Sequence, residues 1–522
     1  MVVARLGSSE ESTSTNYTQR LLDKLAAGGK RDAIVHGKRR ISCLEARSIV
    51  LRFARALVEN GVGEGDRVAL FAVNSPEALL LKIAVHFVGG CLVFVPPAPG
   101  NSELAAFIAR ADVKMLIFDP VLGERAAELA RQAQVPAVFS LGESDGVPDF
   151  LRDADGRAEL AQADAGDGSA VGTLLYTGGT TGSPKLVTHR SRFYDFVLAI
   201  AAGRRWTSAD PRTLVCTLIT HFSGHVVSLA ALLAGETVVL MDGFDAGVAL
   251  SVLAAEKVTA MIVVPPMLYE ILDHPDWPTA GFPHIESISY AGSPTAPSRL
   301  RQAIDRFGPV MNQYYASSEQ GVMTQLRPEE HDLSRPHLLS SCGRPAPGVE
   351  IELRDSSGPV TAIGQVGEVY ARGGMVMAGY WQQPAQTSGV LPGGWSPTGD
   401  LAYRDEEGYL YLVGRAKDVI VTGPSSGNVY SRLLDDFLCT LPGIGQAAAV
   451  GVPDDRYSEA VHVFLVPAGS GHPDLGEVRR RVVAELGDLY EPKSFSIVGS
   501  LPLTTVGKVD KDALRAVYLA VA

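Results

Sequence analysis

The segment from Tyr176 to Lys185 reads Tyr-Thr-Gly-Gly-Thr-Thr-Gly-Ser-Pro-Lys and combines residue types that can hold a phosphate group. Its glycines allow the backbone to approach an anion closely, and its hydroxyl groups can donate hydrogen bonds to phosphate oxygens. The apolar stretch Val171–Tyr176 predicts a strand that leads into this loop. No Gly-Lys-Ser/Thr triplet closes the segment, so it is not a Walker-type nucleotide loop. The alternative is a Gly/Thr-rich surface loop without a ligand.

Two other patterns suggest different chemistry. A Gly-x-Ser-x-Gly pattern centred on Ser425 fits the nucleophile of a serine hydrolase, and Asp454 and His462 follow in the chain order of that class. We consider this a remote alternative, because too little chain follows Ser425 for the usual later strands. His221 and His225 have the spacing of a zinc-binding helix, but the glutamate that should follow the first histidine is absent, so we do not expect zinc.

Further motifs follow one another in a fixed order. They are His221-Phe-Ser-Gly224, Ala291-Gly-Ser-Pro294, Gln313-Tyr-Tyr-Ala-Ser-Ser-Glu319, Trp395-Ser-Pro-Thr-Gly-Asp400, Gly414-Arg-Ala-Lys-Asp418 and Pro502-Leu-Thr-Thr-Val-Gly-Lys508. Together with the Tyr176–Lys185 loop they cover nearly the whole chain, from about residue 41 to residue 515. In this order they resemble the adenylate-forming superfamily, which contains acyl-CoA synthetases, firefly luciferase and the adenylation domains of peptide synthetases.

The resemblance implies an ATP-dependent ligase that converts a carboxylic acid into an acyl-adenylate and then transfers the acyl group to a nucleophile. A carboxylate attacking an α-phosphate is repelled by its charge, so catalysis depends on positioning and electrostatic stabilisation. The family implies Mg²⁺ held partly by Glu319, and a catalytic lysine, Lys508, that bridges the acyl carboxylate and the α-phosphate. A sensor that only binds the ligand would not need a mobile lysine, so Lys508 argues against that alternative.

The resemblance also implies how ATP is bound. Asp400 would accept both ribose hydroxyls with support from Arg415, Tyr315 would stack on adenine, and Ser318 would contact the α-phosphate. Lys417 occupies the family's hinge position, although an ordinary exposed charge is an equal alternative. The other residues expected to contact the nucleotide are Thr177, Gly179, Thr180, Thr181, Gly182, Lys185, Gly292, Ser293 and Pro294.

The loop after the hinge bears on the acceptor of the acyl group. After Gly423 the family normally continues Gly-Glu-Asn-Ile-Tyr-Pro-x-Glu-Val-Glu, whereas this chain reads Pro-Ser-Ser-Gly-Asn-Val-Tyr-Ser-Arg-Leu-Leu-Asp435. In acyl-CoA synthetases this loop lines the pantetheine tunnel. Its alteration favours an amine or amino acid as acceptor, as in the coronafacic acid ligases and other amide-bond synthetases that the sequence resembles, with CoA as the alternative. His221 is a candidate base for the incoming ammonium; its alternative role is to line the pocket.

The composition and net charge limit which binding partners and which cellular location we expect. The chain has 522 residues, a hydrophobic fraction of 46% and a charged fraction of 20%, which is typical of a globular protein of two to four domains. A net charge of −12 offers no attraction to nucleic acid or to an anionic membrane surface, so neither is expected as a partner. Five cysteines without a C-x-x-C pair, and no secretory or membrane-spanning run, predict a reduced cytoplasmic protein.

The elements that must position these residues alternate along the chain. Helical spacing at Leu44–Asn60 and Ser75–Phe87 alternates with short apolar runs at Arg67–Ala72 and Leu92–Val95. This rhythm predicts an α/β fold whose mostly parallel sheets are covered by helices. Residues 1–18 are expected to form a flexible tail.

The character of the sequence changes after about residue 345. Short strands separated by Gly and Asp turns predict a β-barrel portion, and alternating strands and helices over Val419–Leu486 predict a small α+β unit. We therefore expect a large N-terminal adenylating domain at residues 1–416 and a small mobile C-terminal lid at residues 417–522. The lid would carry Lys508, with the active site in the cleft between the two domains.

Overall fold

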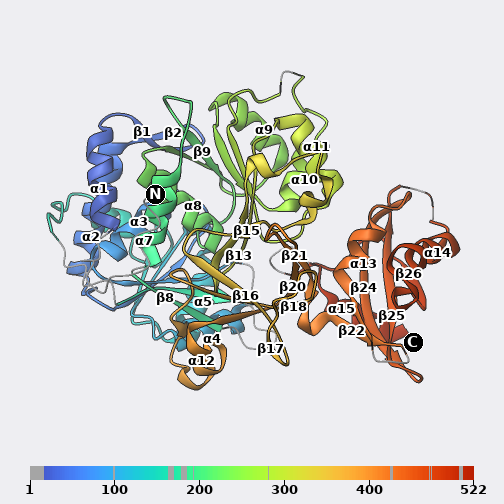
Figure 1. Ribbon diagram of the computed structural model, residues 1–522. Helices are drawn as coiled ribbons and strands as arrows, with labels where there is room; N and C mark the ends of the chain where they lie inside the picture. The colour runs from blue at the N-terminus through green and yellow to red at the C-terminus, as the bar shows by residue number, and fades with distance from the viewer. Residues whose placement is uncertain are drawn as a thin grey trace.

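The computed structural model describes residues 17–97, 100–162, 170–177, 185–191, 193–279, 281–423, 427–469, 471, 473–504 and 509–521. These residues form a large N-terminal domain of several sheets and a smaller C-terminal domain (Figure 1). The α/β fold class is therefore as expected. No helix among the described residues is long and apolar enough to cross a membrane.

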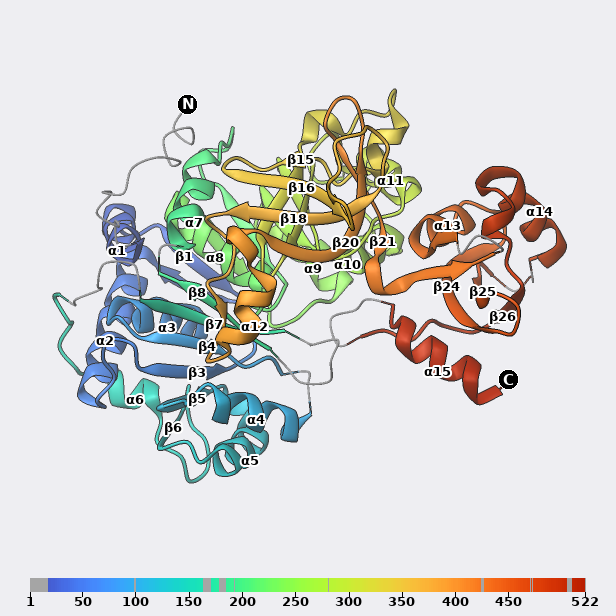
Figure 2. The same cartoon turned by 60° about the horizontal axis from the view of Figure 1, so that its bottom comes forward.

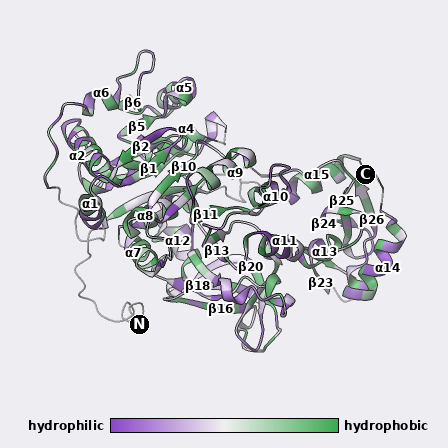
Figure 3. Ribbon diagram, turned by 90° about the horizontal axis from the view of Figure 1, so that it is seen from above, coloured by the Kyte–Doolittle hydropathy of each residue, from purple (hydrophilic) through white to green (hydrophobic). Residues whose placement is uncertain are grey.

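One large sheet organises the middle of the chain. Its strands are β1 (Asp32–His36), β2 (Arg39–Ser42), β9 (Arg212–Val215), β10 (Thr237–Leu240), β11 (Ala260–Val263), β12 (Ser287–Tyr290), β13 (Met311–Ser317), β14 (Gly321–Leu326) and β15 (Arg344–Pro345). Their order is β15-β14-β13-β12-β11-β9-β10-β1-β2, and β13, β12, β11, β9, β10 and β1 are parallel. The parallel strands β10 and β11 are buried along their whole length and, apart from Thr237, apolar in sequence (Figure 3), as expected for strands covered on both faces.

A second sheet lies beside the first. Its strands are β3 (Arg67–Phe71), β4 (Cys91–Phe94), β5 (Met115–Phe118), β6 (Ala137–Ser140), β7 (Val171–Thr177), β8 (Lys185–Arg190) and β19 (Gly379–Tyr380). The order is β19-β8-β7-β4-β3-β5-β6, with β8 and β19 antiparallel to their neighbours and the rest parallel. The prediction of mostly parallel sheets is confirmed for both.

Helices cover both sheets. They are α1 (Tyr17–Gly28), α2 (Cys43–Glu59), α3 (Pro76–Phe87), α4 (Asn101–Arg110), α5 (Gly123–Ala133), α6 (Phe150–Ala154), α7 (Phe193–Gly203), α8 (Phe222–Ala234), α9 (Ala246–Ala255), α10 (Pro265–Asp273), α11 (Pro297–Phe307) and α12 (Pro384–Val390). The largest core joins α1, α2, α3, α7 and α8 to the inner faces of both sheets. The outer face of the first sheet packs against α9–α11, and that of the second against α4 and α5.

Local sequence explains where several of these helices begin. Ser42 accepts a hydrogen bond from the backbone of Glu45, whose side chain bonds back to Ser42, so a capping box starts α2. The Ser75 side chain accepts from the backbone N–H of Ala78 and so caps α3, and Pro76 fits its first turn. The predicted flexible tail of residues 1–18 is wrong for its last two residues, because α1 begins at Tyr17; residues 1–16 lie outside the described residues. Tyr17 is buried in the main core, which holds this end of the chain in place.

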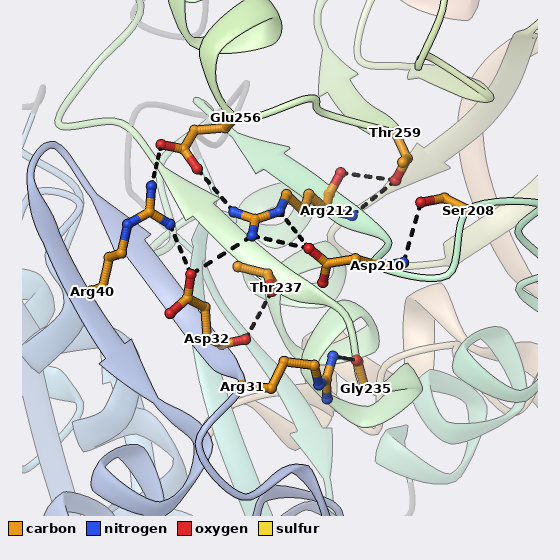
Figure 4. Close-up of polar contacts among 10 residues, drawn as sticks. All are labelled: Arg31, Asp32, Arg40, Ser208, Asp210, Arg212, Gly235, Thr237, Glu256 and Thr259. Atoms are coloured by element: carbon orange, nitrogen blue, oxygen red, sulfur yellow. Dashed lines mark hydrogen bonds and ion pairs between the residues drawn. The ribbon is translucent and has the colours of Figure 1, made fainter.

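Ion pairs join the strands at the edge of the first sheet where β1 and β9 begin (Figure 4). Arg40 bridges Asp32 at 2.7 Å and Glu256 at 2.8 Å, and Arg212 bridges Glu256 at 2.9 Å and Asp32 at 3.7 Å. Arg212 also contacts Asp210 at 3.0 Å. Two arginines and two carboxylates therefore alternate in a closed ring that ties β1, β2, β9 and the end of α9 together. The carboxyl ends of the parallel strands lie at the opposite edge of the sheet and take no part in this ring.

The expected β-barrel portion takes the form of a five-stranded antiparallel sheet. Its strands are β16 (Val349–Asp355), β17 (Gly358–Pro359), β18 (Gly367–Gly373), β20 (Ser396–Arg404) and β21 (Leu410–Arg415), in the order β17-β16-β18-β20-β21. Apolar residues on one face pack against Met323 of β14 and Cys342, so this sheet is attached directly to the end of the first sheet.

The C-terminal elements lie to one side of the N-terminal domain (Figure 2). They are β22 (Val419–Thr422), β23 (Gly427–Tyr430), α13 (Ser431–Leu438), β24 (Ile444–Asp454), β25 (Ser458–Pro467), α14 (Leu475–Leu486), β26 (Ser494–Ile497) and α15 (Lys511–Val521). The sheet β24-β25-β26 packs α13 and α14 on one face and α15 on the other. The predicted strict alternation is wrong here, because β24 and β25 are joined directly as a hairpin whose turn is closed by Asp454.

Candidate active site

Asp400, Tyr315 and Arg415 come from three strands and meet at one point. The Tyr315 hydroxyl donates to Asp400 Oδ2 at 2.6 Å, and Arg415 Nε lies 2.9 Å from Asp400 Oδ1. Antiparallel pairing of β20 with β21 sets Asp400 opposite Arg415. Burial, followed by the negative charge of Asp400, raises the pKa of Tyr315 well above 10, so its hydroxyl stays protonated. A carboxylate has about four acceptor sites, so Asp400 can accept two more hydrogen bonds.

The two residues that flank the loop expected to hold phosphates lie close to each other. Thr177 and Lys185 are directly opposite each other in the β7–β8 pair, whereas Gly179, Thr180, Thr181 and Gly182 lie outside the described residues. The Lys185 ammonium lies 4.9 Å from the centre of the Tyr380 ring. Burial and then the nearby Glu319 carboxylate raise the pKa of Tyr380 to about 12.

Tyr380 was missed by the sequence analysis. Its neighbours Lys185 and Glu319 are separated from it by long stretches of sequence, and they meet only because β19 pairs with β8. A lone Gly-Tyr pair carries no local signal of such a place. The structure therefore brings Lys185, Tyr380 and Glu319 together at the mouth of the candidate phosphate loop.

Other predicted residues follow the carboxyl ends of parallel strands in the first sheet. His221 follows β9, Gly292–Pro294 follow β12, and Ser318 and Glu319 follow β13. Since these strands are parallel, the segments lie along one edge, where open α/β sheets bind ligands. This edge is opposite the ion-pair ring of Figure 4.

His221 and His225 do not act as a pair. His221 is the N-terminal cap residue of α8 and is exposed, with Nδ1 at 3.4 Å from Ser223 Oγ. His225 is buried, and its Nε2 lies 2.9 Å from the Tyr194 hydroxyl. Throughout the described ranges, no three His, Cys, Asp or Glu side chains gather closely enough to hold a metal ion.

At the C-terminal end, Lys417 pairs with Asp512 of α15 at 3.0 Å, and Asp418 pairs with Arg515 at 3.2 Å. The predicted hinge is thus ion-paired to the helix that follows the lysine loop. Lys508 itself lies outside the described residues, between the paired residues Leu503 and Val509.

The serine hydrolase alternative receives no support. Ser425 lies outside the described residues. His462 contacts Ser494 Oγ at 2.6 Å and Ser496 Oγ at 3.0 Å, and Asp454 binds Lys493 and the β24–β25 turn. A catalytic triad requires the carboxylate to orient the imidazole, and this carboxylate is occupied elsewhere.

Comparisons with known proteins agree with this geometry. A family model described as AMP-binding enzyme matches residues 22–381, and one described as AMP-binding enzyme C-terminal domain matches residues 434–508. The medium/long-chain-fatty-acid–CoA ligase FadD8 of Mycobacterium tuberculosis is 35% identical over 488 residues, which cover 90% of this chain and 84% of that protein.

Two solved structures are similar over almost the full length. The amide bond synthetase McbA from Marinactinospora thermotolerans has a TM-score of 0.88 and 34% identity, covering 96% of this chain and 99% of that one. ATP-bound MatB from Rhodopseudomonas palustris has a TM-score of 0.88 and 27% identity, covering 97% and 99%. With a family match over more than half of its length, this chain belongs to the AMP-binding enzymes of the adenylate-forming superfamily and is an ATP-dependent, AMP-forming ligase.

Proposed function

We propose that this ligase makes amides: it activates a carboxylic acid as its acyl-adenylate and transfers the acyl group to an amine or amino acid. The observation that carries the proposal is the rebuilt segment after the hinge. In acyl-CoA synthetases the corresponding loop lines the pantetheine tunnel. Of this segment the structure describes residues 427–435: β23 pairs antiparallel with β22, with Thr422 opposite Gly427, and leads into α13, whereas residues 424–426 lie outside the described residues.

The paired strands β22 and β23 are anchored to their own domain. Gly427 packs so closely on Leu489 that an added Cβ would lie 2.8 Å from a Leu489 methyl carbon. The Tyr490 hydroxyl accepts from the Tyr430 backbone N–H at 3.4 Å. At the end of the segment Asp435 is tied to Lys511 at 2.6 Å. A segment held in this way moves with its domain as one unit, so the feature that favours an amine acceptor is its altered sequence, which departs from that of the loop that lines the pantetheine tunnel.

The comparisons include relatives that are named for each of the two acceptor classes, amines and CoA. McbA is named an amide bond synthetase, and its structure aligns with nearly the whole of this chain. FadD8 is named a CoA ligase. The altered segment favours the amine, and a CoA thioester formed by the same adenylate route is the alternative.

In the proposed first half-reaction, an acyl carboxylate oxygen attacks the α-phosphorus of ATP and pyrophosphate leaves. Asp400 binds the ribose hydroxyls, Tyr315 stacks on adenine, Ser318 contacts the α-phosphate and Lys508 bridges the two reacting groups. Glu319 offers one carboxylate for Mg²⁺, which commonly binds proteins through one or two carboxylates and takes substrate phosphates as further ligands. When bound, Mg²⁺ neutralises phosphate charge.

The second half-reaction joins the amine nitrogen to the acyl carbon and releases AMP. The ammonium form of the acceptor must lose a proton before it can attack, and His221 at the start of α8 is the proposed base. We place the domain boundary at residue 417, so that residues 417–522 reorient between the two half-reactions. In the described orientation, Lys417 and Asp418 are ion-paired to α15.

The deciding experiment is ATP consumption with a panel of carboxylic acids, followed by mass spectrometry of the products. Each reaction contains CoA, an amino-acid mixture, or both. We expect an amide together with AMP and pyrophosphate. Formation of a CoA thioester without amide would contradict the proposal and would make the protein an acyl-CoA synthetase.

Separate assays of the two steps test the residue roles. Lys508→Ala should abolish acid-dependent ATP–pyrophosphate exchange but spare amide formation from a supplied acyl-adenylate. Lys493→Ala is the matched control, because it removes an exposed lysine of the same domain that pairs with Asp454. His221→Ala should slow only amide formation; equal loss in both steps would refute its role as the base.

A further inference from the structure

The turn between β13 and β14 carries Ser318 and Glu319, and three separate segments hold it. His189 of β8 contacts the Ser318 carbonyl, the Met377 backbone N–H donates to the Glu319 carbonyl at 2.7 Å, and Gln320 reaches β20. The two backbone carbonyls of the turn are thus bound by different parts of the chain. A two-residue stretch held from three directions has little freedom to move.

His189 connects the turn to the strand that leaves the phosphate loop. It lies four residues after Lys185, and its Nε2 is 2.8 Å from the Ser318 carbonyl oxygen. A carbonyl oxygen only accepts, so Nε2 carries the proton. The imidazole is buried, with its centre 4.4 Å from that of the Phe193 ring and 6.4 Å from that of Phe222. Burial lowers the pKa of His189 to about 4, which keeps the ring neutral and its single N–H directed at Ser318.

Gln320 connects the same turn to the strand that carries Asp400. Its side-chain nitrogen donates to Ser396 Oγ at 2.8 Å and to the Pro397 carbonyl at 3.0 Å. Its backbone N–H donates to Ser317 Oγ at 2.9 Å, which closes the turn on itself. Gln320 is 5% exposed, so these bonds are shielded from water.

We propose that His189 and Gln320 are positioning residues that hold Ser318 and Glu319 at a fixed distance from both strand β8 and Asp400. The inference rests on the proposed roles of Ser318 and Glu319 in adenylate formation. Reacting groups misplaced by about 1 Å can cost on the order of 100-fold in rate, so a loosened turn should be visible in kinetics.

The test separates the hydrogen bond of His189 from its packing. His189→Phe keeps a buried aromatic ring and removes the donor, whereas His189→Gln keeps an N–H donor at nearly the same reach. In acid-dependent ATP–pyrophosphate exchange we expect His189→Phe to lower kcat roughly 10- to 100-fold and to raise the Mg²⁺ concentration needed for half-maximal rate. His189→Gln should stay within about fivefold of the parent, and the KM for the acid should be unchanged in both. Gln320→Leu should resemble His189→Phe and also raise the KM for ATP.

His331→Phe is the matched control. His331 is also buried, and its Nδ1 contacts a backbone carbonyl, that of Arg327, at 2.8 Å, but it does not contact the turn. Its replacement should lower the melting temperature without changing the Mg²⁺ dependence. If His189→Phe does not fold, His189→Asn takes its place, since its amide is too short to reach Ser318.

Calorimetry of ATP binding with and without Mg²⁺ makes the test independent of turnover. The parent should bind ATP more tightly with Mg²⁺, and His189→Phe should lose most of that gain. A parent that shows no exchange with any acid would contradict the proposed function, while the binding comparison would still decide the inference. Parent-like kcat and Mg²⁺ dependence in His189→Phe, or equal impairment of His189→Gln, would overturn it.

Discussion

Replacing Asp400 with Asn removes one acceptor from a site where three strands meet. In the parent, Asp400 Oδ2 accepts from the Tyr315 hydroxyl at 2.6 Å and Oδ1 contacts Arg415 Nε at 2.9 Å. Asn has the same size, but its amide nitrogen donates and cannot accept. One of the two protein donors and one ribose hydroxyl therefore lose their acceptor, while the fold around the side chain is kept.

The expected size follows from these contacts. A hydrogen bond to a charged group contributes about 1.5–3 kcal/mol, so loss of one to the ribose should weaken ATP binding roughly 10- to 100-fold. Tyr315→Phe removes only the hydroxyl that orients Asp400 and keeps the ring for stacking. Its effect should be about 1 kcal/mol, or roughly fivefold.

The assay is the KM for ATP in ATP–pyrophosphate exchange at saturating acid, with melting curves to confirm folding. Because the Tyr315 hydroxyl acts through Asp400, the double variant should be little worse than Asp400→Asn alone. A KM for ATP within twofold of the parent in Asp400→Asn would refute the assignment of the ribose site. Full multiplication of the two single effects would refute the coupling.

Three further predictions concern the scaffold. The free energy of unfolding should fall as the pH drops from 6.5 to about 4, because burial holds the pKa of His86 at about 4 and only the unfolded state takes up a proton on this side chain in that window. The loss should reach up to about 3 kcal/mol. In urea unfolding, the free energy of His86→Gln should depend less steeply on pH than that of the parent, and an equal dependence would contradict this. Glu236→Ala should lower the free energy of unfolding measured in urea by about 3–5 kcal/mol, because the fully buried carboxylate pairs with Arg204 and its removal leaves the guanidinium without this partner. A loss below about 1 kcal/mol would show that the pair is dispensable. Gly321→Ala should impair both stability and pyrophosphate exchange, since φ is +68° and the new Cβ would lie 2.4 Å from Met375 Cβ; parent-like values would mean that the turn can shift.

Local sequence was sufficient for much of the fold. Continuous apolar runs predicted the buried parallel strands β3 and β4, and the helical spacing at Leu44–Asn60 predicted α2 to within one residue at each end. These signals are local, because period and capping act within a few residues. The hairpin of β24 and β25 was missed for the opposite reason: pairing between neighbouring strands is decided by the turn and the packing, which strand runs alone do not reveal.

The motifs in the sequence determined the family, the adenylate chemistry and the assignment of Tyr315, Asp400 and Arg415 to the nucleotide site. They could do so because residue types and their order along the chain can be recognised without a structure. Only the tertiary structure decided that these three side chains touch, although 85 positions separate Tyr315 from Asp400. It alone found His189, which contacts the turn from another sheet. The physical reason is that a hydrogen bond needs its partners within about 3 Å, and over such separations the distance is set by sheet register and helix packing.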